Sequence, residues 1–129
     1  MLILGSRVAN SAVMSLQTGT RIGRAVHPII DPATLQIFAY QVDGPLLSQH
    51  PSFLRTTDIR EMSAVGMIVD SSDELVGLDD IIKLQQLYEL HFPLVGMAVI
   101  DETHHKLGKV EDYTKTELQI NTGKEVIIY

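Results

Sequence analysis

Apolar and polar residues alternate in short runs along most of this chain, and such alternation is typical of β-strands. The runs are rich in valine and isoleucine, and segments containing glycine, proline, asparagine or aspartate separate them. The runs expected to form strands are residues 13–16, 22–30, 35–42, 53–55, 65–69, 107–113, 118–120 and 125–129. The pattern therefore predicts a mainly β protein with several hairpins.

One segment, residues 78–91, has a different period. Within it, Ile81, Leu84 and Tyr88 recur at the spacing of one face of an α-helix. Pro93 follows shortly afterwards, and a proline disfavours helical geometry in the residue before it. We expect one helix over residues 78–91, with its apolar face packed against a sheet.

A short sequence pattern occurs twice. Ile22-Gly23-Arg24-Ala25-Val26 and Leu107-Gly108-Lys109-Val110 each place a glycine before a basic residue in a strand-like run. Leu35-Gln36-Ile37 follows the first copy, and Leu118-Gln119-Ile120 follows the second at nearly the same distance from the glycine. A repeated pattern indicates a repeated folding unit, so the chain is predicted to use one small β unit twice.

The two copies divide the chain into three parts. The expected boundaries are residues 1–76 for the first unit, 77–93 for the connecting helix and 94–129 for the second unit. The second unit begins with Gly96-Met97-Ala98-Val99, which parallels Asn10-Ser11-Ala12-Val13 in the first. Each unit is expected to begin with the same strand.

The second unit is incomplete. It has no counterpart of the Asp58-Ile59-Arg60 turn, or of the strand that follows this turn in the first unit. Its final strand would therefore leave an open edge, and an open edge of apolar residues invites pairing with another chain. The residues expected at this interface are Val126, Ile127, Ile128 and Tyr129. We expect a homodimer or a larger homo-oligomer.

Four residues are expected to set the backbone geometry of the units. Gly23 and Gly108 lie inside strands, where glycine indicates a bulge or a close backbone approach. Asp31 precedes a proline, so its side chain is expected to accept hydrogen bonds from the backbone of the turn. Asp58 or its neighbour Thr57 is expected to cap a single helical turn.

This ordered set of motifs resembles the PRC-barrel family. The motifs are the Ile22–Val26 run, the Asp31-Pro32 turn, the Asp58-Ile59-Arg60 turn and the Leu107–Asp112 run of the second copy. The family is named for the photosynthetic reaction centre, whose H subunit carries this domain. The same barrel forms the C-terminal domain of a bacterial ribosome maturation factor. The resemblance implies a small PRC-type β-barrel, a connecting α-helix and a second, partial β-barrel. It also implies that the barrels mediate protein contacts.

Composition and charge exclude several classes of function and of site. The net charge is −6, whereas sequence-independent binding to nucleic acid needs an excess of lysine and arginine, so direct nucleic-acid binding is not expected. The absence of cysteine excludes disulfides and thiolate metal sites. No apolar run approaches the roughly 20 residues of a membrane-spanning helix. We expect a cytoplasmic protein without membrane association.

One cluster has the residue types of a metal site. His104 and His105 lie near Asp101 in a predicted hairpin turn. Neighbouring residues of a strand point to opposite faces, so two adjacent histidines rarely bind one ion, and a polar hairpin tip is the simpler interpretation. No catalytic triad order, phosphate-binding loop or dinucleotide fingerprint is present. The sequence therefore predicts neither an enzyme nor a cofactor.

The function expected from these observations is that of a non-catalytic protein-binding adaptor or assembly module. One alternative, suggested by the resemblance, is a role in ribosome or RNA maturation through a ribosomal protein. Another is a small-molecule or metal sensor that uses a pocket between the two units.

Overall fold

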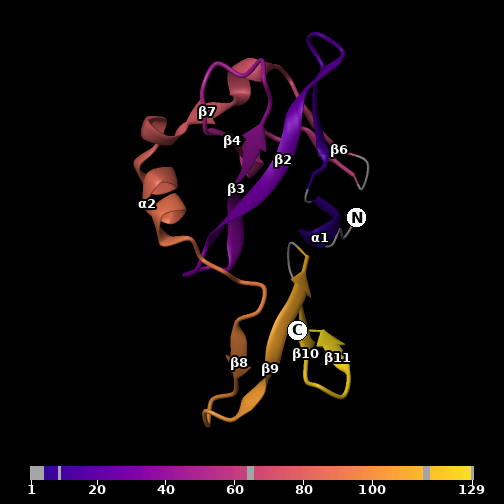
Figure 1. Ribbon diagram of the computed structural model, residues 1–129, viewed down its shortest axis with the longest axis vertical. Coiled ribbons are helices and arrows are strands. Elements are labelled where there is room, and N and C mark those ends of the chain that lie inside the picture. The colour runs from indigo at the N-terminus through magenta and orange to yellow at the C-terminus, as the bar shows by residue number, and fades with distance from the viewer. Residues whose placement is uncertain (1–4, 9, 64–65, 115–116, 129) are drawn as a thin grey trace.

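The computed structural model describes residues 5–8, 10–63, 66–114 and 117–128. Its strands form a seven-stranded sheet in the upper part of Figure 1 and a four-stranded sheet in the lower part. Helix α2 lies beside the first sheet, and the short helix α1 lies between the two sheets (Figure 1). Among the described residues, no helix is long and apolar enough to cross a membrane.

The mainly β expectation is confirmed. The strands of the first sheet are β1 (Ala12–Ser15), β2 (Thr20–Asp31), β3 (Gln36–Asp43), β4 (Ser52–Arg55), β5 (Glu61–Met62), β6 (Gly66–Val69) and β7 (Val76–Gly77). Those of the second sheet are β8 (Ala98–Ile100), β9 (Lys106–Tyr113), β10 (Leu118–Asn121) and β11 (Val126–Ile128). The helical segments are α1 (Gly5–Val8), η1 (Thr56–Asp58), η2 (Ser72–Glu74), η3 (Leu78–Asp80) and α2 (Ile82–Leu90). The strand orders are β5-β6-β1-β2-β3-β4-β7 and β11-β10-β9-β8, so the first sheet extends one residue beyond the expected boundary at residue 76.

The first sheet curls around a shared core. Leu54 on β4 and Met67 on β6 are fully buried in one cluster, although three strands separate β4 from β6 in the sheet. Adjacent strands lie about 4.8 Å apart, so a flat sheet would hold these two side chains roughly 19 Å from each other. The shared cluster shows that the sheet bends strongly, as a small barrel requires.

The connecting helix is shorter than predicted at its start. Leu78–Asp80 forms a 3-10 turn, Ile81 is extended with φ −135° and ψ 119°, and only Ile82–Leu90 is α-helical. The Asp80 carboxylate accepts a hydrogen bond of 2.7 Å from the backbone N–H of Gly77. This side-chain bond gives the backbone a local partner outside the helical ladder, a role in which aspartate commonly competes with helix formation.

The apolar face predicted for the helix is present and covers the outer side of the first sheet. Leu84 and Leu87 are buried in a cluster with Phe53 of β4, and Ile81 and Tyr88 pack against that cluster. The rings of Phe53 and Tyr88 meet edge to face with their centroids 5.4 Å apart. The helix therefore packs on the sheet as expected.

The internal repeat is visible in the hydrogen bonds. The backbone N–H of Asn10 donates to the carbonyl of Ala25 at 2.7 Å, and the N–H of Gly96 donates to the carbonyl of Val110 at the same distance. Asn10 and Gly96 also share a left-handed backbone, with φ of 65° and 92°. The predicted parallel between the first strands of the two units is therefore confirmed.

Both motif glycines lie at a close backbone approach. In each unit the residue just before the glycine, Ile22 or Leu107, is the extra residue of a β-bulge in the pairing with the first strand of that unit. A Cβ on Gly23 would lie 2.7 Å from the carbonyl oxygen of Asp43, and one on Gly108 would lie 2.1 Å from that of Asn121. The same contact occurs in both units, so the two glycines serve the same backbone geometry.

The alignment of Leu35-Gln36-Ile37 with Leu118-Gln119-Ile120 that the sequence suggested was wrong. Leu35 is not in a strand: it lies in the turn between β2 and β3 with φ of 56°. Asp43 pairs with Arg24 and Asn121 pairs with Lys109, and each of these basic residues follows a motif glycine. The segment that corresponds to Leu118–Asn121 in the first unit is therefore Tyr40–Asp43. The hairpin of the first unit is therefore the longer one.

The longer hairpin connects the two units. Ile30 on β2 is buried in one cluster with Leu94, Val110 and Tyr113 of the second unit, and Ile37 of β3 packs against them. The first unit thus contributes side chains to the core of the second, which is too small to bury its own apolar face alone.

Asp31 and Asp58 act differently from each other. Asp31 accepts a hydrogen bond from the backbone N–H of Ala33 at 2.9 Å, as predicted, and its other oxygen lies 3.2 Å from Lys83 Nζ. The Ala33 N–H and then Lys83 hold the pKa of Asp31 below its usual value. The η1 turn has Arg55 at its N-cap and no side-chain cap, so the cap predicted at Thr57 or Asp58 was wrong. The Asp58 carboxylate instead pairs with Arg55 Nε at 2.9 Å.

Candidate functional site

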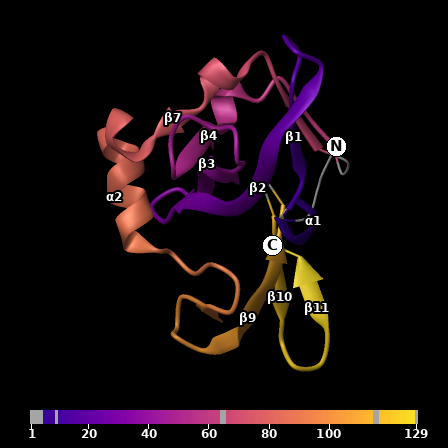
Figure 2. The ribbon, with the colours of Figure 1, turned by 45° about the horizontal axis from the view of Figure 1, so that its top comes forward.

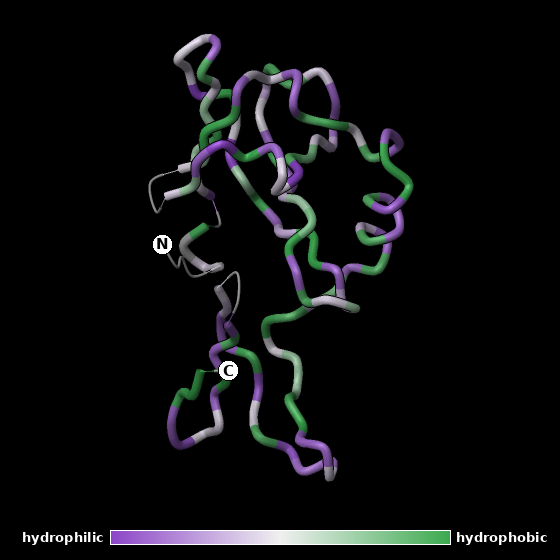
Figure 3. The backbone as a smooth tube through the Cα atoms, turned by 180° about the vertical axis from the view of Figure 1, so that it is seen from behind, coloured by the Kyte–Doolittle hydropathy of each residue, from purple (hydrophilic) through white to green (hydrophobic). Residues whose placement is uncertain are grey.

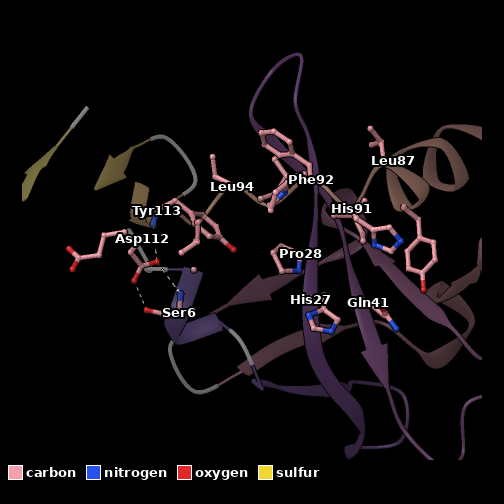
Figure 4. A pocket seen from close by; sticks show the side chains of 17 residues that line it. Ser6, His27, Pro28, Gln41, Leu87, His91, Phe92, Leu94, Asp112 and Tyr113 are labelled. Atoms are coloured by element: carbon pink, nitrogen blue, oxygen red, sulfur yellow. Dashed lines mark hydrogen bonds between the residues drawn. The ribbon is translucent and has the colours of Figure 1, made fainter. Parts of the chain in front are cut away.

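A cavity of about 630 Å³ lies between the two units (Figure 4). Its walls come from β2 and β3, from the end of α2 with the segment after it, from β9 and from α1. Pockets that bind small molecules commonly have volumes of roughly 300–1,000 Å³ and mostly apolar walls. Pro28, Leu87, Phe92 and Leu94 supply such walls here.

One side of the cavity presents polar groups that have no hydrogen-bond partner among the described residues. His27 on β2 and Gln41 on β3 are cross-strand neighbours, and both line the cavity. His91 follows α2 in a left-handed conformation, with its ring centroid 5.5 Å from that of Tyr88. Within the described part of the chain, no hydrogen bond involves the side chain of His27 or Gln41. These two groups are therefore available to a bound molecule.

On the other side of the cavity, the polar side chain of Asp112 has hydrogen-bond partners within the protein. The buried Asp112 carboxylate accepts hydrogen bonds from the backbone N–H and the hydroxyl of Ser6 and from the N–H of Tyr113. The Tyr113 ring packs on Gly5, where a Cβ would lie only 2.1 Å from the ring. Burial, with the neighbouring Asp112 carboxylate as a second cause, raises the pKa of Tyr113 to about 12. This wall holds α1 against β9.

The internal repeat explains why the two sides differ. His27 and Asp112 occupy the same place in their strands, because each lies opposite a glutamine, Gln41 or Gln119, just beyond a bulge. Asp112 has Ser6 as its partner, whereas His27 has no polar partner among the described residues. None of the site and interface residues expected from the sequence lines the cavity in the described part of the chain, whereas Tyr88, Pro93 and Asp112, named from the sequence only for the helix and the repeat, do line it. The signal that could have pointed to His27 as a cavity residue is its equivalence to Asp112, and this equivalence requires the correct strand register of the two units.

The histidine cluster is a hairpin tip. Asp101 Oδ1 accepts hydrogen bonds from the N–H groups of His105 and Thr103, each at 2.9 Å, and from the Thr103 hydroxyl at 2.8 Å. The His105 N–H first, and then the Thr103 hydroxyl, hold the pKa of Asp101 below its usual value. His104 has φ of 66°, the value that Gly19 has in the corresponding hairpin of the first unit. No group of three or more potential metal-ligating side chains occurs among the described residues. The cluster is accounted for by turn geometry.

The second sheet has two edges without a neighbouring strand in the described part of the chain. β11 pairs only with β10, and β8 pairs only with β9. In β11, Val126 and Ile128 are about half exposed and Ile127 is partly buried, while Tyr129 lies outside the described residues. Figure 2 shows β11 on the outer side of this sheet, and Figure 3 shows its hydrophobic character. These edges are the most open apolar backbone of the described second unit.

Comparison with known proteins adds no assignment. No model of a protein family matches this chain, and no curated protein matches it either. The fold and its edges therefore provide the basis for a functional proposal.

Proposed function

We propose that this protein is a non-catalytic binding module that associates with protein partners, including a second copy of itself, through the edges of its second sheet. The resemblance of its motifs to PRC-barrel domains supports the same function. In this proposal the first unit is the stable scaffold, and the smaller second sheet presents the contact surface.

The observation that carries the proposal is the edge strand β11. Proteins usually protect an edge strand with charges, proline, a bulge or a covering segment. The strand Val126–Ile128 contains no charge and no proline, and two of its aliphatic side chains are about half exposed. Two identical edges can pair antiparallel around a two-fold axis, which is the commonest symmetry of homo-oligomers.

Sedimentation velocity at micromolar concentration tests this proposal. We expect a dimer for the unaltered chain and a monomer for Ile128→Lys, because a lysine on the paired edge would place a charge in the apolar contact. Ile82→Lys is the matched control, since Ile82 is 75% exposed on α2, away from the edge. A monomer from the unaltered chain, or equal dissociation by both variants, would contradict the proposal.

The cavity supports a second candidate, a small-molecule sensor. Its lining combines two side chains without a hydrogen-bond partner among the described residues, the exposed His27 and its neighbour Gln41, with apolar residues, so a ligand with an apolar body and a hydrogen-bonding group fits best. A thermal-shift screen with small apolar acids and amides is expected to raise the Tm of the unaltered chain but not that of His27→Ala. Equal shifts for both proteins, or no shift for either, would exclude the site.

A further inference from the structure

The strand β8 is the counterpart of β1, but among the described residues β1 has a strand on its outer side and β8 has none. β1 lies between β2 and β6, and β6 runs parallel to it. Among the described residues, β8 pairs with β9 alone. Ala98–Ile100 contains neither a charge nor a proline, so nothing in its sequence protects this edge.

In the first unit, β6 completes the core. Val13 of β1 pairs with Met67, and Ser15 pairs with Val69. Val13, Met67 and Val69 are fully buried in one cluster. The strand on the outer side of β1 therefore supplies two alternate side chains to the interior.

The second unit keeps the core positions but lacks this cover. The backbone N–H groups of Ser11 and Met97 donate to Val8 and Leu94 respectively, so Val8 and Leu94 correspond, and both are buried. Val99, the counterpart of the fully buried Val13, is only partly buried. An apolar position that is covered in the first unit is thus left partly open in the second.

The sequence of β6 shows which strand fits such an edge. Gly66 pairs with Ala12, and a Cβ at Gly66 would lie 2.8 Å from the Ala12 carbonyl oxygen. The residue at the position of Ala12 in β8 is again an alanine, Ala98. A strand of this kind therefore needs glycine opposite Ala98, followed by an aliphatic residue, any residue and a second aliphatic residue.

We propose that a partner protein adds such a strand to the outer edge of β8, parallel to β8 and in the register that β6 has on β1. This inference rests on the proposed function and specifies the partner: an extended segment of the type glycine–aliphatic–any–aliphatic. Main-chain hydrogen bonds hold the segment in place, as in other cases of strand addition. The first aliphatic side chain covers Val99, and the second lies opposite Asp101, the counterpart of Ser15.

A synthetic peptide with the sequence of residues 61–70 is the probe, because it contains Gly66, Met67 and Val69. We expect saturable binding of the fluorescent peptide to the full chain by anisotropy, with NMR shifts centred on β8. Gly66→Val and Met67→Asp in the peptide, and Val99→Asp in the protein, are each expected to weaken binding by about tenfold or more. The peptide variants keep the test valid if Val99→Asp does not fold.

The Ile128→Lys protein separates this inference from the proposed function. It alters the β11 edge only, so its peptide affinity is expected to equal that of the unaltered chain, whatever its oligomeric state. Three outcomes would overturn the inference: no binding up to about 1 mM peptide, equal affinity of the variant peptides, or NMR shifts on β1 in place of β8. The last result would mean that the peptide displaces the protein's own β6.

Discussion

Replacing Gly108 with alanine is expected to destabilise the protein by about 3 kcal/mol, which for a chain of this length lowers the Tm by roughly 10 °C. The added Cβ would lie 2.1 Å from the carbonyl oxygen of Asn121, which is backbone of the paired strand, and the residue has φ of 159°. The clash therefore requires β9 and β10 to separate. Denaturant unfolding followed by circular dichroism measures the change.

Two other glycines are the controls for this prediction. Gly23→Ala places the Cβ 2.7 Å from a backbone oxygen, a milder conflict, and is expected to cost about 1–2 kcal/mol. Gly123 has φ of 89° but no atom within 4 Å of the added Cβ, so Gly123→Ala tests the backbone conformation alone, at about 1 kcal/mol. Equal losses for Gly108→Ala and Gly123→Ala would show that the close approach in the second unit contributes nothing.

Replacing Leu94 with alanine is expected to cost about 2–4 kcal/mol and to loosen the second sheet. Leu94 is 6% exposed and shares a cluster with Ile30, Val110 and Tyr113, so its removal leaves a cavity where the two units meet. Hydrogen exchange is expected to become faster in β9 and β10, while the central strands of the first sheet keep their protection. Mass-spectrometric exchange on the unaltered and Leu94→Ala proteins measures both effects.

Leu90→Ala is the matched control, because Leu90 is 61% exposed at the end of α2 and its loss is expected to change stability by no more than about 0.5 kcal/mol. Combining Leu94→Ala with Ile30→Ala tests the connection between the units, since residues in contact give non-additive losses. Additive losses would indicate that the long hairpin of the first unit does not support the second.

Much of the secondary structure follows from local sequence. The alternation in residues 22–30 predicts β2, because valine and isoleucine fit a pleated surface with one buried face. The apolar stripe of Leu84 and Tyr88 predicts the packed face of α2, because helix periodicity determines which side chains meet the sheet. Gly23 and Gly108 likewise indicate a close approach, since a glycine inside a strand needs a geometric reason.

The register of the repeat does not follow from the sequence. Leu35 and Leu118 occur in the same short pattern, yet Leu35 lies in a turn and Leu118 begins a strand. Strand register depends on bulges and on which partner lies opposite, and both are properties of the folded sheet. The predicted start of α2 was wrong for a similar reason, because the hydrogen bond from the Gly77 N–H to the Asp80 carboxylate competes with the backbone hydrogen bonds of a helix.

The sequence by itself determined that this protein is mainly β, that a short strand pattern occurs twice, and that a glycine in each copy lies at a close backbone approach. These properties are encoded locally, in side-chain period and in the absence of a Cβ. Only the tertiary structure decided that the hairpin with Ile30 enters the second core, that His27 and Gln41 share a cavity, and that β8, within the described ranges, has no outer neighbour such as β1 has. These properties depend on residues far apart in the chain, whose contacts arise only when the two sheets pack together.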